Sequence, residues 1–183
     1  LSVQLEGKNE VDFERIGHLE EQPMLGGDSA TIYPKKMLFG ILTGFLNKKK
    51  LIKLRLFNEK ETRFYLKQLD ENYNIIKTTS AGRILDAVSA LLGICDKMDY
   101  DGRPAMLLES NACGKKPYDL SPVFEKKENI TILKTTPLFE FLLKNITKDK
   151  GRLAATAQTY LARGLYKIAK QRKKPIVFSG GVA

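Results

Sequence analysis

The sequence predicts a helix-rich α/β fold, because stretches with helical periodicity outnumber stretches that alternate like strands. Apolar residues recur three and four positions apart in several segments between residues 34 and 170. The strand patterns are short and lie mainly toward the two ends of the chain. With 183 residues, 43% of them hydrophobic, the chain can bury a core, so we expect one large domain or part of one.

The first expected element is a β-hairpin over residues 1–13. Leu1, Val3 and Leu5 alternate with polar residues, and a Gly-Lys-Asn turn at 7–9 separates them from a second alternating run that ends at Phe13. The chain begins with this pattern and without a methionine. We therefore expect it to be truncated at this end.

At the other end, residues 174–178 predict a short buried strand that runs into Ser179, Gly180 and Gly181. Two glycines after a strand can bring backbone N–H groups close to a phosphate, although a simple turn has the same pattern. The helix that usually follows such glycines is not in the sequence. We expect truncation here as well.

Helical patterns fill most of the remaining chain. The expected elements are a helix from Pro34 into the lysine run at 48–50, a helix over 59–70, a turn at 100–103 leading to a helix with Pro104 in its first turn, a strand at 130–134, a helix around 139–146, and a long helix over 152–170. In the long helix the spacing places Leu153, Ala157, Leu161, Leu165 and Ile168 toward the core.

The most informative helix is the one predicted over residues 80–93, because it carries a single acid, Asp86, within its apolar pattern. Ser80 occupies the position of an N-terminal cap and Gly93 that of a C-terminal stop. The apolar stripe consists of Ile84, Leu85, Val88, Leu91, Leu92 and Cys95. A carboxylate beside this stripe costs free energy unless it is solvated, paired or hydrogen-bonded, and a ligand hydroxyl would serve as a partner. The pattern is equally compatible with an ordinary surface acid.

Charge and composition limit the function classes. The 31 Lys and Arg residues exceed the 21 Asp and Glu residues by ten, which favours polyanions such as nucleotides, nucleic acid or acidic membranes. The lysine clusters lie at expected helix ends and loops, a pattern typical of a solvated surface, so we expect no nucleic-acid partner.

Cysteine and histidine usage points to no metal site within the chain. Cys95 and Cys113 form no CxxC pair, and the single His18 cannot make a two-histidine site, so we interpret His18 as structural. No apolar run is long enough to cross a membrane, and no signal-peptide pattern is present. We expect a cytoplasmic protein with no membrane partner.

Three segments resemble the HypF family of carbamoyltransferases, which act in [NiFe]-hydrogenase maturation. They are residues 17–28 with their Leu-Gly-Gly-Asp sequence, residues 79–93 together with 100–102 and 108–109, and residues 178–183. The similar region of HypF is its C-terminal domain, which in turn is similar to the TsaD/Kae family that modifies tRNA. The resemblance covers essentially all 183 residues.

The resemblance implies a two-lobed fold of the actin-like ATPase (ASKHA) type, of which residues 1–183 would be a single fragment. It implies that carbamoyl phosphate and ATP give carbamoyl adenylate, and that the carbamoyl group passes to the C-terminal cysteine of the partner HypE to supply a cyanide ligand. We expect the fragment alone to be inactive. The family's metal ligands, an upstream histidine cluster and a downstream aspartate, would lie outside this chain.

The resemblance also implies a nucleotide site. Asp86 would accept hydrogen bonds from the ribose, Gly82 and Gly102 would allow close approach of the backbone, and the glycines near the end would face the phosphate. Arg83 would either orient the neighbouring loop or meet the phosphate. The expected nucleotide-binding residues are Gly82, Arg83, Asp86, Gly102, Ser179, Gly180 and Gly181. No catalytic residue is identified.

Two alternatives to the carbamoyl-transfer function stay open at this point. The first is a tRNA-modifying relative, for which the charge of +10 would be functional and binding would weaken steeply with salt. The second is a non-catalytic module that docks on HypE through a helical surface.

Overall fold

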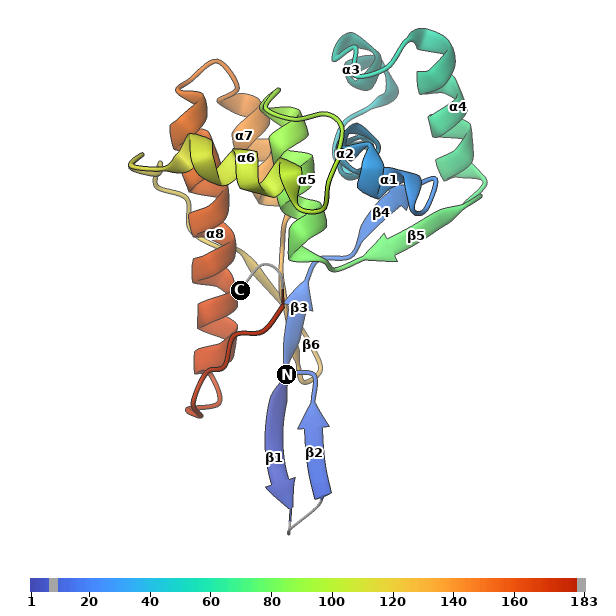
Figure 1. Ribbon diagram of the computed structural model, residues 1–183. Coiled ribbons are helices and arrows are strands. Elements are labelled where there is room, and N and C mark those ends of the chain that lie inside the picture. Colours follow the sequence, from blue (N-terminus) through green and yellow to red (C-terminus); the bar gives the residue numbers. More distant parts are fainter. Residues whose placement is uncertain (7–9, 181–183) are drawn as a thin grey trace.

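The computed structural model describes residues 1–6 and 10–180 of the chain (Figure 1). Its strands are β1 (Ser2–Glu6), β2 (Glu10–Glu14), β3 (Gly17–Leu19), β4 (Gln22–Leu25), β5 (Ile75–Thr78), β6 (Phe124–Lys127) and β7 (Ile130–Leu133). Its helices are α1 (Ser29–Ile32), α2 (Pro34–Thr43), α3 (Lys48–Lys53), α4 (Glu59–Asp70), α5 (Ala81–Leu91), α6 (Arg103–Ala112), α7 (Thr136–Lys144) and α8 (Lys150–Lys170). The helix-rich α/β composition is confirmed.

The strands form three small sheets. β1 and β2 pair antiparallel as a hairpin that extends away from the helices (Figure 1). β3 runs parallel to β7, and β6 pairs antiparallel with the other edge of β7. β4 and β5 form a separate antiparallel ribbon that leads directly into α5.

Helix α5 lies between the two helical parts of the molecule. It contacts α2 on one side and α6 and α8 on the other. Figure 1 shows α1 to α4 with the β4–β5 ribbon on one side of α5, and α6, α7 and α8 on the other. The central position of α5 explains why seven consecutive residues, 84–90, are buried.

Two close approaches fix how helices sit on strands. A Cβ atom at Gly40 in α2 would clash with the carbonyl oxygen of Pro23 in β4, and one at Gly164 in α8 would clash with the side chain of Leu133 in β7. Glycine at these positions lets the α2 backbone approach the β4 backbone, and lets the Leu133 side chain pack against the α8 backbone.

The helix boundaries largely follow the signals in the sequence. Ser80 caps α5, with its hydroxyl oxygen accepting a hydrogen bond from the Arg83 N–H at 3.4 Å, and Gly93 follows the helix with a φ of 61°. Pro104 lies in the first turn of α6. The two paired strands of the expected hairpin, the helix over 59–70 and the strand near 130–134 are confirmed, whereas the expected turn at 7–9 lies outside the described residues.

Three expectations were wrong. The helix from Pro34 does not reach the lysine run, because Gly44 ends α2 and the Asn47 side chain caps a new helix, α3, by accepting from the Lys50 N–H at 3.0 Å. Residues 174–178 form no strand; Val177 and Phe178 are exposed, since no described strand pairs with them. Leu165 is exposed rather than inward, although its four predicted companions are buried.

Candidate functional site

Asp86 lies on the packed side of α5 and is 1% exposed. Its position follows from the helix pattern, since Ile84, Leu85 and Val88 on the neighbouring turns are buried in the core. The sequence left open whether this acid is buried or on the surface. In the structure this acid is buried.

The carboxylate of Asp86 is poorly compensated. Neither of its oxygens accepts a hydrogen bond from a described residue. Its one partner is the Arg83 guanidinium on the preceding turn, an ion pair with 3.0 Å between Nη2 and Oδ2. Burial raises the pKa of Asp86 to about 6; Arg83 opposes this rise and the nearby Asp101 carboxylate adds to it.

Ser89, three residues after Asp86 on α5, is a second buried polar group that the sequence analysis did not single out. Its side chain is 0% exposed and its hydroxyl has no hydrogen-bond partner among the described residues. Residues three apart share a helix face, so the spacing from Asp86 was the signal available. Buried polar groups without partners are rare in proteins, and such groups can mark a site that a ligand completes.

Gly102 begins the next helix, α6, which packs against α5. It has a φ of 76°, a left-handed conformation that favours glycine, and a Cβ at this position would meet no other atom within 4 Å. Gly82 is half-buried in the first turn of α5. The structure thus places Gly82, Arg83 and Asp86 on one helix and Gly102 at the start of its neighbour.

The other predicted residues lie at the C-terminal end of the described chain or just outside it. Ser179 and Gly180 are exposed and form no hydrogen bond or ion pair with another described residue. Gly180 has a φ of 100°, which favours glycine. Gly181 lies outside the described residues, so its predicted role at the phosphate stays a prediction.

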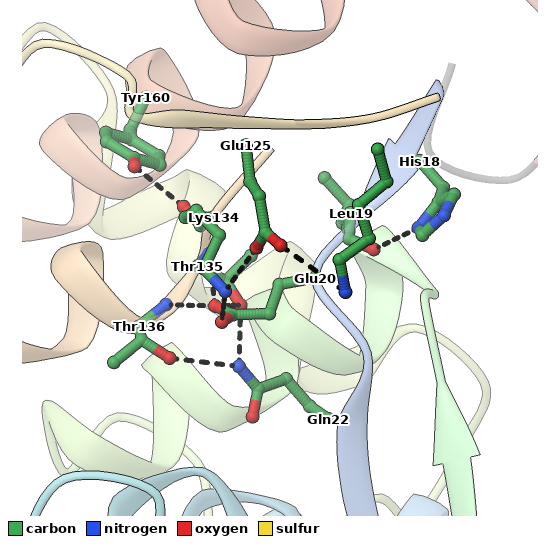
Figure 2. Close-up of polar contacts among 10 residues, drawn as sticks. His18, Leu19, Glu20, Gln22, Glu125, Lys134, Thr135, Thr136 and Tyr160 are labelled. Atoms are coloured by element: carbon green, nitrogen blue, oxygen red, sulfur yellow. Dashed lines mark hydrogen bonds and ion pairs between the residues drawn. The ribbon is translucent and has the colours of Figure 1, made fainter. Parts of the chain in front are cut away.

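A second polar cluster joins β3, β6 and the start of α7 (Figure 2). Glu20 accepts hydrogen bonds from the backbone N–H groups of Thr135 and Thr136 at 2.9 and 2.8 Å and pairs with Lys134, which also pairs with Glu125 at 3.3 Å. Burial alone would raise the pKa of Glu20, but the hydrogen bonds from Lys134 and the two threonines outweigh burial and lower it. This cluster was not predicted, because its residues are distant in sequence.

Neighbouring side chains complete the cluster. The Gln22 amide donates to the Thr135 hydroxyl at 3.0 Å, and the Tyr160 hydroxyl donates to the Lys134 carbonyl at 2.7 Å (Figure 2). His18 Nδ1 lies 2.7 Å from the Leu19 carbonyl oxygen, which supports its structural interpretation. Because Glu20 is hydrogen-bonded to the start of α7 and paired with Lys134, the cluster holds β3 against α7, and we assign it a structural role.

Within residues 1–6 and 10–180, no group of three His, Cys, Asp or Glu side chains is arranged to hold a metal ion. No helix in this part of the chain is long and apolar enough to span a bilayer. The candidate site is therefore the buried polar face of α5 with the start of α6.

Comparison with known proteins identifies the family. The family model described as "Carbamoyltransferase, Kae1-like Domain, second subdomain" matches residues 5–183. The chain belongs to the HypF family of carbamoyltransferases. It is 46% identical over 165 residues to the probable carbamoyltransferase HypF of Methanocaldococcus jannaschii, covering 86% of this chain and 21% of that protein. It is 30% identical over 174 residues to carbamoyltransferase HypF of Rhodobacter capsulatus, covering 92% and 22%.

Solved HypF structures share the fold. The structure of full-length HypF in the phosphate- and nucleotide-bound form matches with a TM-score of 0.79 at 23% identity, covering 88% of this chain and 21% of that one. The structure of T. kodakarensis HypF matches with a TM-score of 0.72 at 30% identity, covering 87% and 22%. The chain spans about a fifth of the length of these HypF proteins. The expected placement within the HypF fold is confirmed.

Proposed function

We propose that residues 1–183 form one part of the Kae-like carbamoyl-transfer domain of a HypF protein. In this proposal, the complete protein uses carbamoyl phosphate and ATP, through carbamoyl adenylate, to carbamoylate the C-terminal cysteine of HypE. The carbamoyl group then supplies cyanide for [NiFe]-hydrogenase maturation. Membership of the HypF family over residues 5–183 supports the proposal, and it favours this function over the tRNA-modifying alternative.

The observation that carries the nucleotide part of the proposal is the buried carboxylate of Asp86, which accepts no hydrogen bond from a described residue and has only the Arg83 ion pair. A carboxylate accepts hydrogen bonds, and a ribose offers two neutral hydroxyl donors. Hydrogen bonds from these hydroxyls would replace the solvation that Asp86 lost on burial. The solved relative bound to phosphate and nucleotide is consistent with this use of the fold.

Arg83 is paired with Oδ2 of this carboxylate, so a bound ribose would compete with the guanidinium for this oxygen. The guanidinium is held to Asp86 by one contact of 3.0 Å and donates no hydrogen bond to another described residue. We propose that it moves from the carboxylate toward the nucleotide phosphate when the site is occupied. The carboxylate then exchanges a guanidinium partner for hydroxyl partners, and the cation gains an anionic partner.

The glycines take supporting roles in this proposal. Gly82 and Gly102 leave space for the nucleotide beside α5, since neither adds a side chain there. Ser179, Gly180 and Gly181 would present backbone N–H groups to the phosphate. The metal ion expected for the complete domain would be bound by residues outside this chain.

The experiment that tests the proposal measures transfer of the labelled carbamoyl group from carbamoyl phosphate to HypE by the full-length protein in the presence of ATP. We expect Asp86→Ala to lower the transfer rate by about 5- to 150-fold, which corresponds to about 1–3 kcal/mol of lost hydrogen bonding. Glu140→Ala, at an exposed acid on α7 outside the three segments that carry the resemblance to HypF, is the control and should leave the rate unchanged.

The possible results separate the parts of the proposal. A HypE variant whose C-terminal cysteine is replaced should acquire no label. Wild-type transfer without sensitivity to Asp86 would retain the reaction but refute the nucleotide site. No transfer by the wild-type protein, with ATP and HypE both active in a control reaction, would refute the proposed reaction itself.

A further inference from the structure

Ser89 takes no part in the function proposed above, although it is buried in the middle of the molecule. Its side chain is 0% exposed and its hydroxyl has no hydrogen-bond partner among the described residues. A buried hydroxyl without a partner destabilises a folded protein, because it has lost its hydrogen bonds to water. Ala87 and Ala90, two buried residues nearby on α5, show that this helix accepts alanine at packed positions. Packing alone therefore gives no reason for a serine here.

Two acceptors lie on the turn of α5 that precedes Ser89. A helical serine often donates to the backbone carbonyl four residues earlier, which here is that of Leu85, but the structure shows no such hydrogen bond. The other acceptor is the carboxylate of Asp86, three residues earlier on the same helix face. The Cα–Cβ bonds of a helix tilt toward its N-terminus, so the Ser89 side chain leans toward the turn that carries Asp86.

The carboxylate of Asp86 lies between Arg83 and Ser89, which precede and follow it by three residues. Arg83 contacts Oδ2 at 3.0 Å, whereas Oδ1 accepts no hydrogen bond from a described residue. When Arg83 moves to the nucleotide phosphate, as proposed above, Asp86 loses its cationic partner. At 1% exposure Asp86 has little access to bulk water, so the donors that remain for it are the ribose hydroxyls and Ser89.

We propose that Ser89 is a positioning residue of the nucleotide site. When nucleotide is bound, the Ser89 hydroxyl donates a hydrogen bond to Oδ1 of Asp86 and holds the carboxylate in the orientation that the ribose requires. A carboxylate has about four acceptor positions, so this bond leaves room for both ribose hydroxyls. The inference rests on the proposed nucleotide site and adds to it the group that fixes the acid.

A serine with a purely structural role would behave differently. If Ser89 only fills space, or donates to the Leu85 carbonyl, its replacement changes the affinity for every nucleotide equally through the packing of α5. If it orients Asp86, its replacement changes only the contribution of the ribose hydroxyls. The ratio of the affinities for ATP and 2′,3′-dideoxy-ATP isolates this contribution, because the two ligands share their base and triphosphate.

The test measures this ratio by calorimetry with the full-length protein. Ser89→Ala removes the hydroxyl, Ser89→Cys keeps a similar shape with a weak donor, and Ser89→Thr keeps the hydroxyl. Ser121→Ala, at an exposed serine between α6 and β6, is the control. Circular dichroism of each variant verifies that the fold is retained. If threonine is too large for the buried position, the alanine and cysteine variants still decide.

We expect Ser89→Ala and Ser89→Cys to lower the preference for ATP by about two- to tenfold, because one hydrogen bond to the carboxylate is lost. The affinity for 2′,3′-dideoxy-ATP should stay unchanged in both variants. Ser89→Thr and Ser121→Ala should keep the wild-type preference. In the Asp86→Asn background, Ser89→Ala should have no further effect, since the two side chains act as one unit.

The outcomes separate this inference from the nucleotide site itself. If the wild type prefers ATP through Asp86 but Ser89→Ala keeps the full preference, the inference is overturned and the nucleotide site stands. An equal loss of affinity for both nucleotides in Ser89→Ala would assign the serine to packing and would likewise overturn the inference. A wild type without any preference for ATP would refute the nucleotide site, and the inference with it.

Discussion

The substitution Asp86→Asn is expected to change how the stability of the protein depends on pH. Burial raises the pKa of Asp86 from 3.8 to about 6, so the folded state binds its proton more tightly than the unfolded state does. Between these two values the folded protein holds more protons, and its stability therefore falls as the pH rises. The ionised carboxylate is a destabilising feature of the folded protein at neutral pH.

The magnitude follows from the size of the shift. A rise from 3.8 to about 6 corresponds to about 3 kcal/mol in total, of which about 2 kcal/mol falls between pH 4 and pH 7. Asn cannot ionise, so the variant lacks this contribution. The unfolding free energy of the wild type minus that of Asp86→Asn should therefore decrease by about 2 kcal/mol between pH 4 and pH 7.

The assay is urea unfolding of both proteins at several pH values. Unfolding is monitored by far-UV circular dichroism, because this chain has no Trp whose fluorescence could report it. Taking the difference between the two proteins removes the contributions of other titrating groups. Parallel curves over this pH range would refute the reasoning, and so would a difference that grows toward neutral pH. Arg83→Gln should enlarge the effect, because the guanidinium is the group that opposes the rise in pKa.

Two further predictions concern the fold that positions the site. Glu20→Gln should lower the unfolding free energy by about 1–3 kcal/mol at neutral pH, because Thr135, Thr136 and Lys134 lose their carboxylate partner. Folding lowers the pKa of Glu20, so this stabilisation is present above pH 4.5, and the difference between wild type and variant should vanish as the pH falls through the folded-state pKa. The control Glu140→Gln, at an exposed acid, should show neither effect. Gly40→Ala should destabilise by about 1–3 kcal/mol, because the added methyl meets the Pro23 carbonyl, while Gly44→Ala at the end of the same helix should cost less than about 1 kcal/mol; equal Tm values for the two glycine variants would contradict the close approach of α2 and β4.

The longer helices were predictable from the sequence because they carry periodic apolar residues and explicit end signals, such as Ser80 before α5 and Pro104 in α6. The short helices α1 and α3, of four and six residues, were not predicted as separate elements. The strands β3, β4, β5 and β6 were not predicted, since three or four residues show too little alternation to be distinguished from loops. The apolar run at 174–178 predicted burial that depends on a neighbouring strand, which the described residues do not provide.

The candidate site was predictable only in part. Asp86 stood out because a single acid interrupts an apolar stripe, but its burial depends on α2, α6 and α8 packing around α5. A serine on a helix often donates to the carbonyl of the preceding turn, so the free hydroxyl of Ser89 could not be inferred from its spacing. The contact of Glu20 with Thr135 joins residues 115 positions apart, a distance that sequence patterns do not bridge.

The most direct test of the account asks whether Asp86 binds ribose hydroxyls. Affinities of the full-length protein for ATP and for 2′,3′-dideoxy-ATP are measured by calorimetry, for the wild type and for Asp86→Asn. We expect the wild type to prefer ATP by about 5- to 150-fold and this preference to be largely lost in the variant. Equal affinity of the wild type for the two nucleotides, or the same preference in the variant, would contradict it.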